Sequence, residues 1–243
     1  MAKDTIVTGS KLTAIANAIR AKGGTSAQLT LDQMPQAVDD LPTGGGGFDT
    51  SQLTGMIKFY GPSGYSYYSI DVAGLDLSNM TMANGMFSDM TRLTSLVNSH
   101  QLNAPRAGNM TAMFGNCQYL TSLDLGGLDT SGTGSFVRMF DGCTRLASLN
   151  LANISMARVR DTNSMFQGCS ALTDIIWATK RQTVVALPTD PSNMNITSTM
   201  QFYVPDALLS EYQSATNWAT IASQIHSIND LPASVAALYA GHY

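Results

Sequence analysis

Met-Phe pairs recur along the chain at an almost constant interval, and this internal repeat restricts the possible folds more than any other feature. The pairs begin at Met86, Met113, Met139 and Met165. Each cysteine of the chain follows the Phe of one pair by three positions: Cys117, Cys143 and Cys169. Leucine or isoleucine occupies two further equivalent positions in every copy: Leu93, Leu120, Leu146 and Leu172, and then Leu96, Leu123, Leu149 and Ile175. Agreement over these columns in four copies indicates a chain built from equivalent structural units.

The spacing inside one copy indicates its local structure. Apolar residues from Met110 to Leu120 recur at intervals of three and four, which predicts a short amphipathic helix. After Leu120 the interval changes to two, with Leu123 and Leu125 on one face, which predicts a short half-buried strand. One such unit cannot bury its own apolar stripe, whereas stacked units can. The repeat therefore predicts an α/β solenoid with a parallel sheet along one side.

Segments of these copies resemble bacterial surface-protein leucine-rich repeats of about 26 residues. The segments that carry the resemblance are 78–81, 86–87, 113–117 and 128–131. Residues 203–218 look similar to the cap that closes many arrays of this kind. The resemblance covers about residues 48–228 and implies a leucine-rich-repeat stack. It implies little about function, because such stacks serve as generic adhesive and structural surfaces.

A second resemblance lies near the start of the chain. Residues 12–25 resemble the N-terminal segment of many tail and fibre proteins of phages and prophages in Gram-positive hosts. This resemblance implies an N-terminal attachment module followed by a binding module. Two apolar stripes in residues 9–42 predict two small helices, which are too short to be stable alone. The candidate assembly interface is therefore formed by Leu12, Ile15, Ile19, Met34 and Val38.

The chain divides into four predicted parts: a helical attachment module at 1–43, a glycine linker at 44–47, the solenoid at 48–204 and a helical C-terminal cap at 205–243. Residues 56–70 interrupt the repeat with tyrosines around a Gly-Pro-Ser-Gly sequence, which predicts a β-hairpin. Residues 199–204 are interpreted as the last edge of the sheet. Asn217 is predicted to cap a helix that begins at Trp218.

Composition and charge narrow the function classes. Charged residues make up 12% of the chain and the formal net charge is −4, with no basic cluster. This balance argues against nucleic-acid binding, which depends on neutralising phosphates. No apolar run approaches the length of a membrane span, and the first residues lack the apolar stretch of a secretory signal. We therefore expect no membrane insertion, and a surface role either within a larger assembly or by a route that this chain does not encode.

The sequence motifs predict no catalytic site, no metal site and no bound cofactor. The period of the three cysteines predicts one buried column, which matches no zinc-ligand spacing. The three histidines, His100, His226 and His242, are scattered, and no partner is placed beside them by spacing. No nucleophile, metal-ligand or phosphate-loop motif is present. A Ser-His-Asp site that assembles only in the folded chain stays open as an alternative.

Two surfaces are candidates for ligand binding. The first is the solvent face of the sheet, where small polar side chains are suited to hydrogen-bonding a glycan or are plain solvated surface: Ser122, Asp124, Ser148, Asn150 and Asp174, with Ser95, Val97 and Ile176 beside them. The second is a tyrosine group that either stacks on sugars or caps the open end of the solenoid: Tyr60, Tyr65, Tyr67 and Tyr68.

Together these features predict a non-enzymatic structural protein of a phage or prophage virion, in the tail, a fibre or another virion-surface component. The repeat domain would serve host-surface adhesion, with a host glycan or protein as ligand and other virion proteins bound through the N-terminal module. A homo-oligomer is expected, since virion sites are symmetric. The first alternative is a purely architectural role as capsid or tail decoration or cement, and the second is a bacterial surface adhesin.

Overall fold

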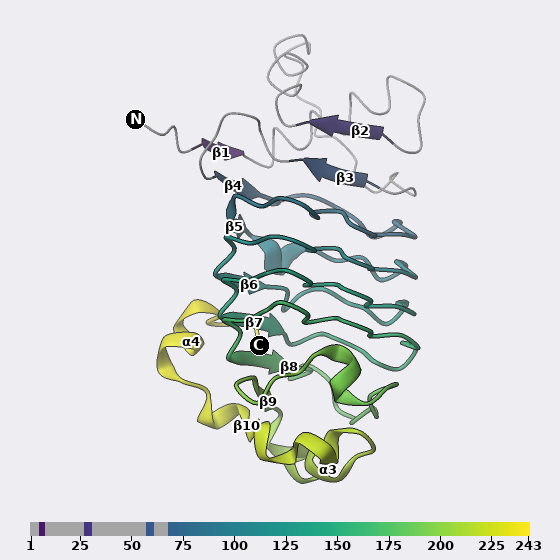
Figure 1. The fold of residues 1–243 in the computed structure, drawn as a ribbon, viewed down its shortest axis with the longest axis vertical. Helices are drawn as coiled ribbons and strands as arrows, with labels where there is room; N and C mark the ends of the chain where they lie inside the picture. The colour runs from purple at the N-terminus through teal and green to yellow at the C-terminus, as the bar shows by residue number, and fades with distance from the viewer. Residues whose placement is uncertain (1–4, 8–26, 31–56, 61–67) are drawn as a thin grey trace.

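Short parallel strands lie one above another along the long axis of the molecule (Figure 1). The computed structural model describes residues 5–7, 27–30, 57–60 and 68–243, with side chains from Ser69 onward. The strands are β1 (Thr5–Val7), β2 (Ala27–Thr30), β3 (Ile57–Tyr60), β4 (Tyr68–Asp71), β5 (Leu93–Val97), β6 (Ser122–Asp124), β7 (Ser148–Leu151), β8 (Asp174–Trp177), β9 (Gln201–Val204) and β10 (Ile225–Ser227). The α-helices are α3 (Leu209–Ser214) and α4 (Ala233–Leu238), and the 3₁₀ helices are η3 (Ser99–Gln101), η4 (Pro191–Met194), η5 (Asp206–Leu208), η6 (Trp218–Gln224) and η7 (Ile228–Asp230).

The largest sheet has five parallel strands in the order β10-β9-β8-β7-β6. Its register places equivalent repeat positions side by side, because Leu123 pairs with Leu149, which pairs in turn with Ile175. Ile175 pairs with Phe202 on the next strand. A second parallel sheet has the order β1-β4-β5, and a third joins β2 to β3. The predicted parallel sheet is confirmed for the five strands β6 to β10, whereas β5, the strand of the first copy, belongs to the second sheet.

The predicted repeat helix is wrong, because the segment from Met110 to Leu120 folds as successive turns. Its backbone contains two left-handed residues, Ala112 (φ 51°) and Asn116 (φ 64°), which a continuous helix does not tolerate. The N–H of Phe114 donates to the carbonyl of Met139 in the next copy, at 2.9 Å, and not to the carbonyl four residues earlier. The apolar spacing is therefore satisfied by short turns whose hydrogen bonds partly run between copies.

Two ladders of side chains fill the centre of the stack. The rings of Phe87, Phe114, Phe140 and Phe166 stack nearly parallel, with centroids 5.2, 5.8 and 5.8 Å apart. The cysteine thiols donate to the Phe carbonyls of the preceding copy, as Cys143 does to Phe114 at 3.1 Å. All three cysteines are buried and none forms a disulfide, as the period predicts. Burial raises the pKa of the Cys169 thiol, which keeps it neutral.

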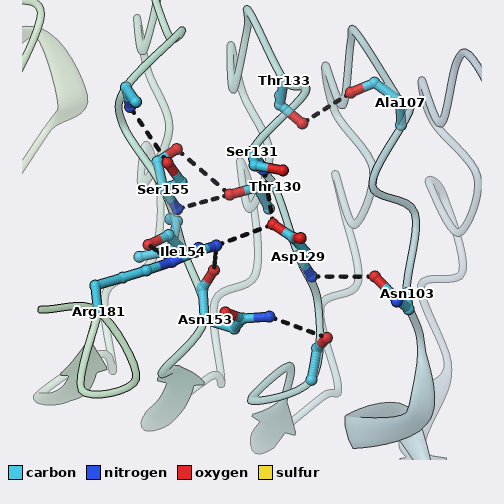
Figure 2. A network of polar contacts seen from close by, with 12 residues as sticks. Asn103, Ala107, Asp129, Thr130, Ser131, Thr133, Asn153, Ile154, Ser155 and Arg181 are labelled. Atoms are coloured by element: carbon cyan, nitrogen blue, oxygen red, sulfur yellow. Dashed lines mark hydrogen bonds and ion pairs between the residues drawn. The ribbon is translucent and has the colours of Figure 1, made fainter.

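A polar network ties three consecutive turns together around Arg181, which follows β8 (Figure 2). The Arg181 guanidinium donates to the Asp129 carboxylate at 2.9 Å and to the Asn153 and Ile154 carbonyls at 2.5 and 3.3 Å. Burial by itself would raise the pKa of Asp129, but hydrogen bonds from Ser131 and Arg181 outweigh it and hold the pKa below its ordinary value. Both side chains of this ion pair are largely shielded from solvent, since 28% of the Arg181 side chain and 31% of the Asp129 side chain are exposed.

The predicted hairpin at residues 56–70 is wrong. Its two strands do not pair with each other, since β3 pairs with β2 and β4 lies between β1 and β5. All of these pairings are parallel, so the repeat pattern of strand pairing extends towards the N-terminus. Strands β1 and β2 come from the predicted attachment module and pair with strands from the predicted solenoid. The two helices predicted there, with Leu12, Ile15, Ile19, Met34 and Val38, lie outside the described residues.

The C-terminal segment is less helical than predicted, because it contributes a tenth strand to the stack. Strand β10 pairs with β9, so β9 is not the last edge of the sheet. Asn217 does not cap the following helix with its side chain; its amide donates instead to the Leu187 carbonyl at 2.8 Å. Trp218 packs edge-on against Trp177, Phe202 and Tyr212 and closes the core at this end. Among the described residues, no helix has the length and apolar character needed to cross a membrane.

Candidate functional site

The chain's own C-terminal segment covers part of the predicted binding face. Ser148 is 4% exposed and Asn150 is 0% exposed, so the expectation that both are solvent-accessible is wrong. Ile176 is also buried and lies in a small apolar cluster with Val235 and Tyr239 from α4 and the residues after it. Figure 1 shows this segment returning from β10 to the strands of the main sheet. The physical reason is that α4 places an apolar side on a face that strand alternation alone would leave in water.

Two polar contacts fasten the segment to β7. The hydroxyl groups of Tyr239 and Ser148 lie 2.9 Å apart. The Asn150 amide donates to the His242 carbonyl at 3.4 Å. Burial raises the pKa of Tyr239 to about 12, so its hydroxyl remains protonated over the whole physiological range. Each buried polar group of β7 thus receives a partner from the segment that covers it.

The other predicted residues of the face differ in their exposure. Asp174 is half-buried, and its carboxylate accepts hydrogen bonds from the Thr173 and Tyr203 hydroxyls at 2.6 and 3.1 Å. Ser122 is half-buried at its position on β6, whereas Ser95 and Val97 are exposed on β5. Val97 presents 39% of its surface to solvent. The open part of the face therefore lies at its β5 end.

The tyrosine group falls mainly outside the described residues. Tyr65 and Tyr67 are not described, and Tyr60 and Tyr68 are described only as backbone positions in β3 and β4. Tyr68 pairs with Leu93 at the start of β5, which places the β4 backbone beside the open end of the face.

A cluster of His100, Asp124 and His242 lies at the edge of the covered part. His100 is in η3, directly after β5, whereas Asp124 ends β6 and His242 follows α4. The two imidazole rings stack with their centroids 3.9 Å apart and their planes 18° from parallel. The His242 Nδ1 lies 2.5 Å from Asp124 Oδ2. The three groups are half-buried, and one ligand atom from each lies within 4.8 Å of the others.

The surroundings hold the carboxylate of this cluster in place. Asp124 Oδ1 accepts hydrogen bonds from the Asn150 amide at 2.8 Å and from the Gly126 N–H at 3.0 Å. Oδ2 is left to face His242. Lys180 lies nearby, and its ammonium donates to the Gly126 carbonyl at 3.0 Å. Burial lowers the pKa of His100, and the neighbouring His242 lowers it further, while Asp124 acts in the opposite direction.

Two glycines allow the three segments to meet. A Cβ on Gly127 would collide with the carbonyl oxygen of His100, and a Cβ on Gly126 would collide with that of His242 and with the Asn150 amide. Only glycine permits so close a backbone approach at these positions. The Gly126-Gly127 pair therefore allows the backbone of both histidines to approach β6.

Sequence reasoning missed this cluster and predicted no metal site. The three residues come from different repeats and from the C-terminal segment, so no fixed spacing relates them. The available signal was the Gly-Gly pair after Asp124, which departs from the other copies. Two imidazoles and a carboxylate are chemically capable of binding a divalent cation, of moving a proton or of forming a hydrogen-bonded clamp.

Comparison with known proteins gives one match. A family model described as "Mycoplasma protein of unknown function, DUF285" matches residues 25–122 and, a second time, residues 100–187. The two overlapping matches together span more than half of the chain. No curated protein and no solved structure matches the chain.

Proposed function

The chain belongs to the DUF285 family, whose function is unknown, and we propose that it is a non-enzymatic structural protein of a phage or prophage virion. In this proposal a short leucine-rich-repeat solenoid is displayed at the virion surface, in the tail, a fibre or another component, for adhesion to the host. Neither cofactor nor metal is needed for adhesion. The observation that carries the proposal is the in-register stacking of the 26-residue repeat.

The solenoid interpretation rests on contacts between successive copies. Each copy adds one parallel strand and one Phe to the ring stack, and each of the last three copies adds one thiol that bonds to the copy before it. The β-bridges between Met82 and Asn109 and between Ser135 and Asp161 repeat the same stacking on a second side of the coil. A stack of this kind buries a continuous core through contacts with nearest neighbours and offers an extended surface for binding.

The open part of the sheet face is the best-supported binding surface. Ser95 and Val97 are exposed on β5, and the tyrosine-bearing strand β4 lies directly beside them. On β4, Ser69 and Asp71 pair with Ser95 and Val97, and a strip of such small and polar residues is suited to hydrogen-bonding a sugar. We place host recognition here and not at Ser148 or Asn150, since the C-terminal segment covers those residues.

Multivalency would make weak recognition sufficient. Virion sites are symmetric, and a homo-oligomer presents several copies of the same face to one cell. The N-terminal part, with the candidate interface residues Leu12, Ile15, Ile19, Met34 and Val38, would bind other virion proteins and orient the repeat domain outward.

Two alternatives use the same fold. In a purely architectural role, as capsid or tail decoration or cement, the open face would be buried against another virion protein. A bacterial surface adhesin would use the same face without a virion, and the word Mycoplasma in the family description favours this second alternative. Accessibility of Val97 in the assembled particle separates cement from adhesin.

The test is binding of fluorescently labelled full-length protein, as monomer and on multivalent beads, to Gram-positive cells and extracted wall glycans. We expect saturable binding that Val97→Asp weakens and that Met82→Asp leaves unchanged. Met82 is a matched control, because it is an apolar side chain of the same stack with 45% exposure. Absence of binding in both formats, or equal loss in the two variants, would overturn host recognition by this face.

A further inference from the structure

We propose that His100, Asp124 and His242 form a binding site for one divalent transition-metal ion, with Zn²⁺ as the best match, which fastens the C-terminal segment onto the sheet. This inference does not depend on the virion role. It assigns a ligand to three residues that neither the repeat nor the adhesion proposal explains.

The donor set fits such an ion. Zn²⁺ accepts imidazole nitrogen and carboxylate oxygen, and three protein ligands leave a fourth position for water. Bonds of about 2.0–2.1 Å to a tetrahedral ion place ligand atoms about 3.3 Å apart. The three ligand atoms here already lie within 4.8 Å of one another. Binding therefore requires a contraction of the cluster, in which one stacked ring rotates so that both imidazole lone pairs converge.

The carboxylate is already oriented by neighbours that need not move. Asp124 Oδ1 is held by the Asn150 amide and the Gly126 N–H, which leaves Oδ2 as the ligand oxygen. Asn150 is fully buried, so it keeps this orientation. Partners of this kind commonly contribute about 10- to 100-fold to metal affinity.

The backbone around the two histidines is equally constrained. Gly126 and Gly127 seat the carbonyls of His242 and His100 at distances that any side chain would prevent. The His242 N–H donates to the Tyr239 carbonyl at 2.9 Å. Only the side chains have to adjust, and these are half-buried and next to solvent, so an ion has access.

One charge opposes the ion and makes the location testable. The Lys180 ammonium donates to the Gly126 carbonyl beside the cluster. Its positive charge disfavours a second cation nearby. Lys180→Gln should therefore strengthen metal binding if the ion occupies this cluster, and should have no effect on an ion bound elsewhere.

The primary experiment titrates ZnCl₂ into untagged full-length protein by calorimetry and records visible absorption with CoCl₂. We expect one ion per chain, a tetrahedral Co²⁺ spectrum without thiolate charge-transfer bands, and a rise in the melting temperature. His100→Ala and His242→Ala should abolish stoichiometric binding. His226→Ala is the matched control, because His226 lies on β10, where it bonds to Gln201, and is not part of the cluster.

A second variant keeps the proposal falsifiable if the alanine variants fold poorly. His242→Gln retains a hydrogen-bonding side chain for Asp124 and should keep the fold while losing the ion. The proposal is overturned if the wild-type protein shows no saturable binding at micromolar Zn²⁺, or if His226→Ala loses the ion as completely as His242→Ala. Unchanged binding by His242→Gln overturns it as well.

Discussion

The contact between Tyr239 and Ser148 gives the sharpest test of the C-terminal segment covering the sheet. The substitution Tyr239→Phe keeps the ring and removes only the hydroxyl. Ser148 is 4% exposed, and its hydroxyl lies 2.9 Å from that of Tyr239. The substitution therefore leaves the Ser148 hydroxyl without this partner inside a covered face.

The expected magnitude follows from this one hydroxyl group. A buried polar group without a partner costs about 1–3 kcal/mol. We expect Tyr239→Phe to lower the free energy of unfolding by about 2 kcal/mol, which corresponds to about 4–8 °C in melting temperature for a chain of this size. Ser148→Ala removes the other hydroxyl of the same contact and should cost a similar amount, about 1–3 kcal/mol.

The double variant separates a direct contact from two independent effects. Removing both hydroxyls should cost about 1 kcal/mol less than the sum of the two single substitutions. The reason is that each single variant leaves one buried hydroxyl without a partner, whereas the double variant leaves none. Urea unfolding followed by tryptophan fluorescence measures the three free energies. Hydrogen exchange at β7 shows whether the segment detaches before the stack unfolds. Additive effects, or a Tyr239→Phe variant within about 0.5 kcal/mol of wild type, would show that the segment is not docked in solution.

The remaining predictions concern the ring stack, the glycine contact and the turn network. Phe140→Ala should lower the free energy of unfolding by about 3–5 kcal/mol, because it removes a fully buried ring that contacts a ring on either side; a urea titration that shows less than about 1 kcal/mol would refute this. Gly127→Ala should lower the free energy of unfolding by at least about 1–3 kcal/mol, because the new Cβ would collide with the His100 carbonyl oxygen. Gly108→Ala is the control and should be nearly neutral, since its Cβ would meet its nearest atom at 3.8 Å. Equal melting temperatures of the two variants would contradict the close approach at Gly127. Because the folded-state pKa of Asp129 is held below its ordinary value, its contribution to stability is present above that value and is lost as the pH falls through the folded-state pKa. Arg181→Met should therefore reduce the loss of stability as the pH falls below the ordinary pKa of an aspartate carboxyl group, and an unchanged acid-unfolding profile would count against the ion pair.

The sequence by itself determined the period, the register and much of the core. The Met-Phe and cysteine columns predicted which residues stack, and Phe114, Phe140 and Cys143 are buried in the ladders that the period implies. The physical reason is that one unit cannot bury its own apolar stripe, so identical units must bury it against one another in register.

The form of each turn was decided only in the folded chain. Ala112 and Arg138 adopt left-handed conformations that their residue types do not predict. They are held there because backbone N–H groups bond to the next copy, as Phe114 does to Met139. Propensity and spacing describe one segment at a time, and they cannot show that a neighbouring segment offers a better hydrogen-bond acceptor.

The candidate metal site and the covered face were likewise decided by tertiary structure alone. Asp124 and His242 are 118 positions apart, and their contact depends on the direction in which the C-terminal segment leaves β10. The alternation of Ser148 and Asn150 correctly placed both on one face, but it contained no information about what covers that face. Ser148 and Asn150 are buried because the apolar side of α4 packs against this face of the sheet, and the sequence of the strands alone does not show that contact.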